Sequence, residues 1–210
     1  TQCDLRVVSQ GLPIRGRIED LDQVLAAVAW LGSPLPGARA PRRADLLPGS
    51  PRPYRQGIHQ GVDLYPAWDH LEPYAVRAAG DGWVVRADGA YGEMTVEERS
   101  DVLARQGPDG SGNPEDLDRL HGRQVWILHG GGVLTRYSHL AWIRAGLSRG
   151  TWIAKGETLG RMGNSGTSAG AEGTRDDTHL HFEVHLASGP FWANLTMSQV
   201  REVLEEVLER

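Results

Sequence analysis

The chain has 210 residues, of which 40% are hydrophobic and 23% are charged, and its formal net charge is −5 at pH 7. This composition predicts a packed globular core. The net negative charge and the lack of a sustained basic run argue against nucleic acid as the main partner, because binding to phosphate backbones usually requires a basic face. No apolar run approaches the roughly 20 residues that span a membrane, so we expect no transmembrane segment.

The first fifty residues divide into a helix and an irregular segment. Residues 18–31 place hydrophobic side chains on one face at helical spacing, and Gly32 is a suitable end for that helix. Residues 33–53 are rich in Pro, Gly and Arg and show no periodicity, which predicts an extended linker or strap. We therefore expect an N-terminal helix and strap over residues 1–53 and a main domain over 54–193.

Cys3 is the only cysteine, so the chain can form neither an internal disulfide nor a thiolate metal cluster. It lies near the start of a chain that does not begin with methionine. One interpretation is that an export signal was removed upstream and that Cys3 lies near a lipid-attachment position. The alternative is an exposed residue of the tail with no role.

The main domain reads as short β segments separated by glycine turns. The chain contains 27 glycines, which suits a turn-rich antiparallel sheet better than a helical domain. The segments that read as strands or hairpins are 76–89, 124–140, 156–166 and 178–186. They predict a mainly β fold, an antiparallel sheet or sandwich-like domain with a central groove and peripheral helices.

Two helical segments interrupt or follow this pattern. Residues 93–122 contain a short helix with Thr95 as its cap and Glu98 three residues on, then a loop and a second helical turn. Residues 194–210 carry a stripe of Val and Leu and predict a docked amphipathic helix.

Histidines alternate along the last predicted strand. His179 and His181 leave the strand on the same face, roughly 6–7 Å apart at Cα, with Leu180 and Phe182 on the other face. Such a pair supplies either two ligands of one metal ion, or one ligand beside one acid–base group.

Two further segments combine histidine with a polar partner. In an extended strand His59 and Asp63 would lie about 13 Å apart, too far to bind one ion. Gly61 between them allows the chain to bend, and His and Asp are both good zinc donors. Tyr137 and His139 are expected on one face of another strand.

These motifs together resemble the lysostaphin-type zinc metallopeptidases, also called LytM-type or glycyl-glycine endopeptidases. That family shows H-x-x-x-D early, Tyr-x-His-Leu in the middle and H-x-H late on a strand. This chain reads HQGVD at 59–63, YSHL at 137–140 and HLHFEV at 179–184, and the resemblance covers about residues 50–190.

The resemblance implies that His59, Asp63 and His181 bind Zn²⁺ and that His139 and His179 form the acid–base pair. Three protein ligands leave a position for water, whose pKa zinc lowers to about 7. One free histidine would take the proton of that water, and the other would stabilise the oxyanion or protonate the leaving amine. The sequence does not assign these two roles.

Other polar residues have weaker assignments. Tyr137 either contacts the substrate or packs across strands, and Asn164 lies in a Gly-rich turn expected at the rim of a substrate groove. Glu183 either orients a histidine or is simply exposed. His70 and His121 fall in segments read as loops, where we expect solvated side chains.

The resemblance implies a zinc endopeptidase that hydrolyses peptide cross-links of bacterial peptidoglycan, acting on stem or cross-bridge peptides. The enzyme would be exported and would act in the periplasm, the cell envelope or the extracellular space. One alternative is a non-catalytic module that activates other wall hydrolases, and another is a peptidase of ordinary proteins. Because all three ligands and both acid–base histidines are present, we favour the wall enzyme.

Two segments depart from compact members of the family. The insertion at 93–122 either forms a wall or lid that narrows substrate choice or is a surface excursion. The N-terminal segment either shields the site or braces the domain.

Overall fold

The computed structural model describes residues 20–65, 74–106 and 113–209. Cys3 and His70 lie outside these ranges, so the predictions made for them stay predictions. Among the described residues, no helix is long and apolar enough to cross a membrane.

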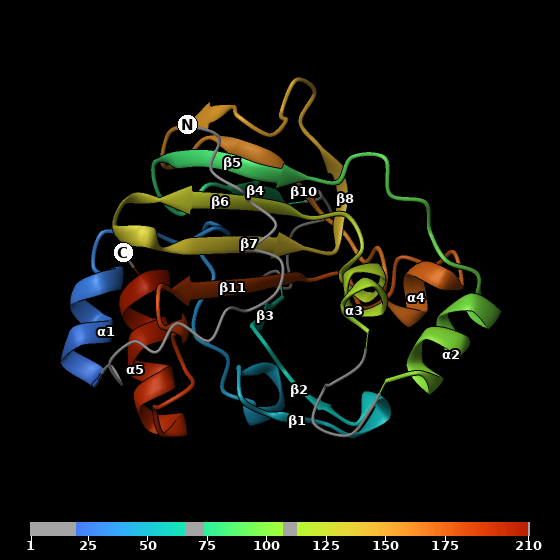
Figure 1. Cartoon of the computed structure of the whole chain (residues 1–210), viewed down its shortest axis with the longest axis horizontal. Helices are drawn as coiled ribbons and strands as arrows, with labels where there is room; N and C mark the ends of the chain where they lie inside the picture. Colours follow the sequence, from blue (N-terminus) through green and yellow to red (C-terminus); the bar gives the residue numbers. More distant parts are fainter. Residues whose placement is uncertain (1–19, 66–73, 107–112, 210) are drawn as a thin grey trace.

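Antiparallel sheets form the body of the molecule (Figure 1). The largest sheet has the strand order β12-β11-β7-β6-β5-β9, and β3 pairs with β11 beside this path. Its strands are β12 (Gly189–Pro190), β11 (Leu180–Leu186), β7 (Leu134–Ser138), β6 (Val125–His129), β5 (Gly82–Ala87), β9 (Trp152–Ile153) and β3 (Val62–Leu64). The predicted fold class, antiparallel β with peripheral helices, is confirmed.

Two smaller sheets complete the β structure. One has the order β4-β10-β8, and the other pairs β1 with β2. Their strands are β4 (Ala75–Arg77), β10 (Thr158–Met162), β8 (Leu140–Ile143), β1 (Pro51–Arg52) and β2 (Gly57–Ile58). Leu159 of β10, Phe182 of β11 and Val203 of the C-terminal helix all belong to one buried hydrophobic cluster, so the sheets and the helices share a core.

The helices lie in two groups, at the two ends of the largest sheet in the view of Figure 1. At one end α1 (Leu21–Val28) packs against α5 (Met197–Leu208). At the other end α2 (Val96–Ala104), α3 (Pro114–His121) and α4 (Ser168–Ala171) gather, with α2 in contact with both of the others. The two predicted helices of the insertion and the closing helix are therefore present.

Local sequence explains where these helices begin. Thr95 caps α2 in a capping box with Glu98, as predicted, and Thr196 does the same for α5 with Gln199. Helix α1 ends at Val28 rather than at Leu31. The chain leaves the helix early because Leu31 is fully buried and the Gly32 N–H donates to the Ala79 carbonyl oxygen at 2.8 Å.

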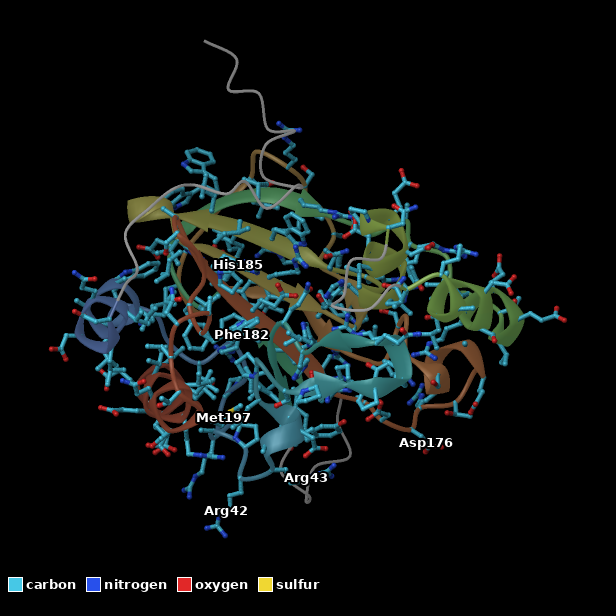
Figure 2. The ribbon with its side chains drawn as sticks, turned by 60° about the horizontal axis from the view of Figure 1, so that its bottom comes forward. Arg42, Arg43, Asp176, Phe182, His185 and Met197 are labelled. Carbon is cyan, nitrogen blue, oxygen red and sulfur yellow. The ribbon has the colours of Figure 1, made fainter. Side chains whose placement is uncertain are left out.

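The strap is ordered against the sheet. In the structure we extend the name strap to residues 33–58, because the chain continues from η2 (Ala44–Leu46) through η3 (Pro53–Arg55) and the hairpin β1–β2 as one segment. Outside the strap, a third 3₁₀ turn, η5 (Gly130–Gly132), joins β6 to β7. Figure 2 turns the strap to the front, with Arg43 near its outer edge and Asp176 on the loop that leads to β11.

Candidate metal centre and its cleft

The early and late motifs meet because β3 pairs with β11. In this register Asp63 lies opposite His181 and Val62 lies opposite Phe182. A Cβ added at Gly61 would lie 2.4 Å from the Phe182 carbonyl oxygen and 2.9 Å from His181 Nε2. Only glycine therefore allows the HQGVD segment to approach β11 so closely.

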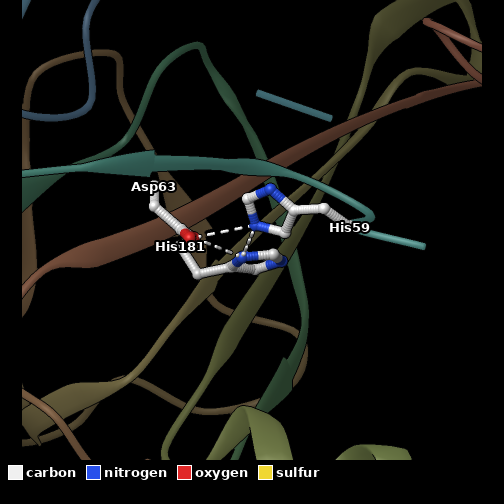
Figure 3. Close-up of side chains that lie close together, drawn as sticks. All are labelled: His59, Asp63 and His181. Carbon is white, nitrogen blue, oxygen red and sulfur yellow. Dashed lines mark hydrogen bonds and ion pairs between the residues drawn. The ribbon is translucent and has the colours of Figure 1, made fainter. Parts of the chain in front are cut away.

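Three donor atoms face one another at this crossing (Figure 3). His59 Nε2 lies 2.9 Å from Asp63 Oδ1 and 3.1 Å from His181 Nδ1, and His181 Nδ1 lies 2.9 Å from Asp63 Oδ1. All three residues are buried. Ligand atoms about 2.0–2.2 Å from a tetrahedral Zn²⁺ are separated by about 3.3–3.5 Å. The observed spacing matches that geometry after an opening of a few tenths of an ångström.

In each of these residues, the nitrogen or oxygen atom that faces away from the cluster has its own hydrogen-bond partner. The atom that faces the cluster is therefore left to coordinate a metal ion. His59 Nδ1 donates to the Leu47 carbonyl oxygen at 3.0 Å, and His181 Nε2 lies 3.0 Å from Glu183 Oε1. Arg52 Nη2 donates to Asp63 Oδ2 at 2.6 Å. Metal-binding histidines characteristically give their second N–H to a carbonyl or a carboxylate in this way.

The protonation of the cluster fits a cation site. Burial lowers the pKa of His59 to about 4, so this ring is neutral at pH 7. Burial disfavours the charged form of Asp63, but hydrogen bonds with His181 and His59 outweigh it and hold the carboxyl pKa well below its usual value. Burial also opposes a charge on His181, yet the bonds to Asp63 and Glu183 raise its pKa.

His139 and His179 join the same cluster. Their ring centroids lie 4.8 Å apart, and His179 Nε2 lies 3.7 Å from Asp63 Oδ1. His139 Nδ1 donates to the Ser165 carbonyl oxygen at 2.8 Å, and His179 Nδ1 donates to the Asp177 carbonyl oxygen at 2.6 Å. With Nδ1 donating to a carbonyl oxygen, the second ring nitrogen, Nε2, faces away from the backbone in both histidines. Burial, with the nearby His179, lowers the pKa of His139 well below its usual value.

The structure corrects the assignment of Tyr137. We expected Tyr137 and His139 on one face of a strand, but β7 ends at Ser138 and His139 has a left-handed backbone (φ 62°). Tyr137 is fully buried, and its hydroxyl oxygen accepts from the Ala79 N–H at 2.8 Å. Its ring packs against Phe182, as the cross-strand packing alternative expects, and the substrate contact stays a prediction that this burial does not support.

Asn164 also has a structural contact. Its side-chain amide donates to the carbonyl oxygens of Thr174 and Asp176, each at 2.9 Å. It is not among the residues that line the cleft described below. Asn164 thus braces the loop before β11, and this geometry does not support the predicted substrate contact.

His121 was expected to be solvated, and that prediction is wrong. The side chain is buried at the end of α3, where Nδ1 donates to the Leu117 carbonyl oxygen at 2.8 Å and Nε2 lies 3.1 Å from Glu183 Oε1. Leu117 and His121 are four residues apart and so share a helix face. That spacing was the available signal, because a helix that turns Leu117 toward the cleft also turns His121 inward.

Glu183 connects this histidine to the centre. Its side chain is fully buried and accepts from His181, His121, His185 and Arg136 at 3.0, 3.1, 2.6 and 3.2 Å. Burial raises the carboxyl pKa, but Arg136 and the three histidines outweigh it and hold the pKa well below its usual value. Of the two alternatives for Glu183, orientation of a histidine is confirmed.

A cleft of about 430 Å³ opens onto these side chains. His59, Asp63, His139, His179 and His181 all line it. The strap and the insertion supply much of the remaining wall: Arg43, Asp45, Leu46, Arg52, Tyr54 and Arg55 from the strap, and Arg99, Leu103, Leu117, Leu120 and His121 from the insertion. The insertion is therefore a wall of the cleft and not a remote surface excursion.

Comparison with known proteins relates part of the chain to a peptidase family. Residues 111–191 match the model of the family described as Peptidase family M23. The predicted resemblance to the lysostaphin- or LytM-type peptidases is thereby confirmed over this segment. Among curated proteins, none matches the chain in sequence.

Solved structures of related shape are distant. The chain shares 19% identity with the catalytic domain of lysostaphin from Staphylococcus simulans, covering 64% of this chain and 71% of that one at a TM-score of 0.38. The chain shares 19% identity with a zinc-containing peptidase from Vibrio cholerae, covering 76% of this chain and 38% of that one at a TM-score of 0.46. With a chain of the SpoIIQ–SpoIIIAH pore-forming complex it shares 20% identity, covering 64% of this chain and 59% of that one at a TM-score of 0.37. The chain thus spans less than two thirds of the latter two chains.

Proposed function

We propose that this protein is a zinc-dependent endopeptidase that hydrolyses peptide cross-links of bacterial peptidoglycan. The observation that carries the proposal is the meeting of His59 and Asp63 with His181. His59 and Asp63 lie outside the segment that matches the peptidase family. Their position beside His181 therefore supports the proposal independently of that match.

In this proposal His59 Nε2, Asp63 Oδ1 and His181 Nδ1 would hold Zn²⁺. A zinc ion held by three ligands polarises a substrate carbonyl and lowers the pKa of a bound water to about 7. Arg52, Leu47 and Glu183 keep the three side chains in their ligating orientation through the bonds described above.

His139 and His179 would move the protons. Each ring holds its Nδ1 hydrogen on a backbone carbonyl, so each Nε2 is free to accept a proton from the attacking water. The imidazolium so formed donates to the leaving amide nitrogen or to the developing oxyanion. The depressed pKa of His139 keeps that ring neutral at pH 7, so its Nε2 lone pair is not already protonated.

The substrate and the location follow from the same assignment. We propose that the enzyme acts outside the cytoplasmic membrane on stem or cross-bridge peptides of the wall. The lipid anchor predicted at Cys3 lies outside the described residues and stays a prediction.

The test uses purified cell walls and the two proposed proton carriers. The parent chain is expected to release soluble peptides with new amino termini. His139→Ala and His179→Ala should each retain one zinc per chain, and their rate of peptide release should fall by at least about 10²-fold. His185→Gln, which changes a histidine of β11 outside the proposed reaction, serves as the control. Walls left intact by the parent chain, with zinc bound, would favour the non-catalytic activator module instead.

A further inference from the structure

Charge is unevenly compensated along the cleft. Its charged side chains, apart from histidine, are Arg43, Arg52, Arg55, Arg99, Asp45, Asp63 and Asp177. Arg43 pairs with Asp45, and Arg52 pairs with Asp63. Asp177 Oδ1 accepts from the Tyr65 hydroxyl at 2.5 Å. Two arginines, Arg55 and Arg99, remain.

Arg55 and Arg99 are held by backbone and not by acidic groups. Arg55 Nη2 donates to the Ile58 carbonyl oxygen at 2.6 Å, and Arg99 Nε donates to the Gly166 carbonyl oxygen at 3.2 Å. Among the described residues, no carboxylate lies within ion-pair distance of either guanidinium. A guanidinium has five N–H donors, so each bond to a carbonyl leaves most of them available.

Burial makes these two cations costly when they are alone. Arg55 is only 8% exposed. Arg99 is half-buried, and this burial lowers its pKa despite the opposing influence of nearby groups: Tyr54, Tyr91, Glu172 and Glu93. Glu93 Oε1 is already engaged by the Gly166 N–H at 2.9 Å. Buried charges are normally paired, so an incoming anion would supply the missing partner.

The two arginines come from neighbouring elements. Arg55 ends η3 of the strap, Arg99 lies in α2 of the insertion, and η3 packs against α2. Both side chains line the cleft that contains His59, Asp63 and His181. An anion bound by them would therefore be part of the same ligand that reaches the candidate metal centre.

We propose that Arg55 and Arg99 form a carboxylate-binding subsite, so that the substrate is a carboxylate-bearing stem peptide and not an uncharged glycine bridge. The inference rests on the proposed function and names its substrate class. Arginine is suited to this task because its planar fork bonds a carboxylate through two parallel N–H groups. The insertion then contributes a charge that selects the substrate, in addition to a wall.

The test compares two fluorescent stem peptides of identical sequence, one with a free carboxylate and one with that group as a carboxamide. Binding is measured by fluorescence anisotropy on the full chain carrying His179→Ala, which prevents turnover. The carboxylate peptide is expected to bind at least about tenfold more tightly. Arg99→Gln should reduce this preference to near one by weakening the carboxylate peptide alone, and Arg55→Gln should do the same if its melting temperature is unchanged.

Arg119→Gln is the matched control, because it removes one positive charge from the insertion at a residue that does not line the cleft and pairs at 3.6 Å with Glu98. It should leave the preference intact. Equal binding of the two peptides, equal weakening of both by Arg99→Gln, or binding of neither would overturn the inference.

Wall hydrolysis by the unsubstituted chain separates this inference from the proposed function. A chain that digests walls but binds both peptides equally keeps the function and contradicts the subsite. A chain that prefers the carboxylate through Arg99 but leaves walls intact keeps the subsite and contradicts the function.

Discussion

At the scale of single residues, Glu183 determines how His181 is presented. Its buried carboxylate holds the ring nitrogen that faces away from the centre, and it also bonds His121, His185 and Arg136. A carboxylate in this position fixes the orientation of the ring and increases the basicity of the ligating nitrogen.

We predict that Glu183→Gln weakens zinc binding by about 10–100-fold, because the amide keeps the shape of the side chain but loses its charge. The dissociation constant is measured by competition with a chromophoric chelator. His185→Gln removes a neighbouring partner of Glu183 without touching His181 and should have a much smaller effect. An unchanged affinity in Glu183→Gln would mean that His181 is oriented by other contacts.

His129 lies away from the centre and carries a prediction about stability. Its two ring nitrogens bond the Asp81 carbonyl oxygen at 2.9 Å and Thr135 Oγ1 at 2.7 Å, and burial lowers its pKa below 6.5. Below pH 6.5 the unfolded chain therefore binds more protons at this residue than the folded chain does. The stabilising contribution of neutral His129 is complete above pH 6.5 and is lost as the pH falls toward its folded pKa.

We therefore predict that the free energy of unfolding falls less steeply below pH 6.5 in His129→Gln than in the parent chain. Urea unfolding with a chelator present, at pH 7.5 and at about pH 5.5, measures the two slopes. Parallel slopes would contradict the assignment of a depressed pKa to this histidine.

At this scale, features set by neighbouring residues could be predicted from the sequence, and features set by distant parts of the chain could not. The alternation of His179 and His181 is a local property and was predicted correctly. The solvated environment predicted for His121 was wrong, because its burial depends on α3 folding back onto β11. The face assigned to Tyr137 was wrong because the backbone of His139 turns left-handed after β7.

At the scale of elements, the insertion is the part of the cleft with the clearest consequence for specificity. Helices α2 and α3 supply a wall, and they also supply Arg99 and His121. Their capping and helical spacing were readable from the sequence because both are local. Their position over the site was not, because it depends on contacts of α2 with η3 and α4.

We predict that replacing residues 94–121 by a short Gly-Ser linker broadens cleavage across a panel of wall peptides and leaves one zinc per chain. The reason is that one wall of the cleft is removed while His59, Asp63 and His181 stay on β11 and its partner segment. His121→Gln in the full chain separates the loss of that histidine from the loss of the wall. An unchanged cleavage pattern would show that the insertion does not select substrates.

The contacts that the strap makes at the site could not be predicted from its sequence. Its lack of periodicity predicted an extended segment, and the sequence left open whether the N-terminal segment shields the site or braces the domain. The structure shows that the Leu47 carbonyl oxygen holds His59 and that the Arg52 side chain holds Asp63. The strap therefore braces two of the candidate ligands, and the same segment lines the cleft.

At the scale of the whole molecule, the fold brings together three motifs that are far apart in the chain. His59 and His181 are separated by 122 positions, and the pairing of β3 with β11 brings their segments together. The motifs and the glycine between His59 and Asp63 allowed this meeting to be predicted through the family resemblance. Spacing alone could not, because a fully extended HxxxD segment keeps its two side chains apart.

The measurement that tests the account most directly is the zinc content of the chain together with its hydrolysis of purified walls, for the parent and for His181→Ala. We predict one zinc per parent chain, with both the metal and the hydrolysis lost in the variant because two remaining ligands bind zinc weakly. A parent chain that binds no zinc, or a His181→Ala variant that keeps both zinc and hydrolysis, would contradict the assignment of this centre.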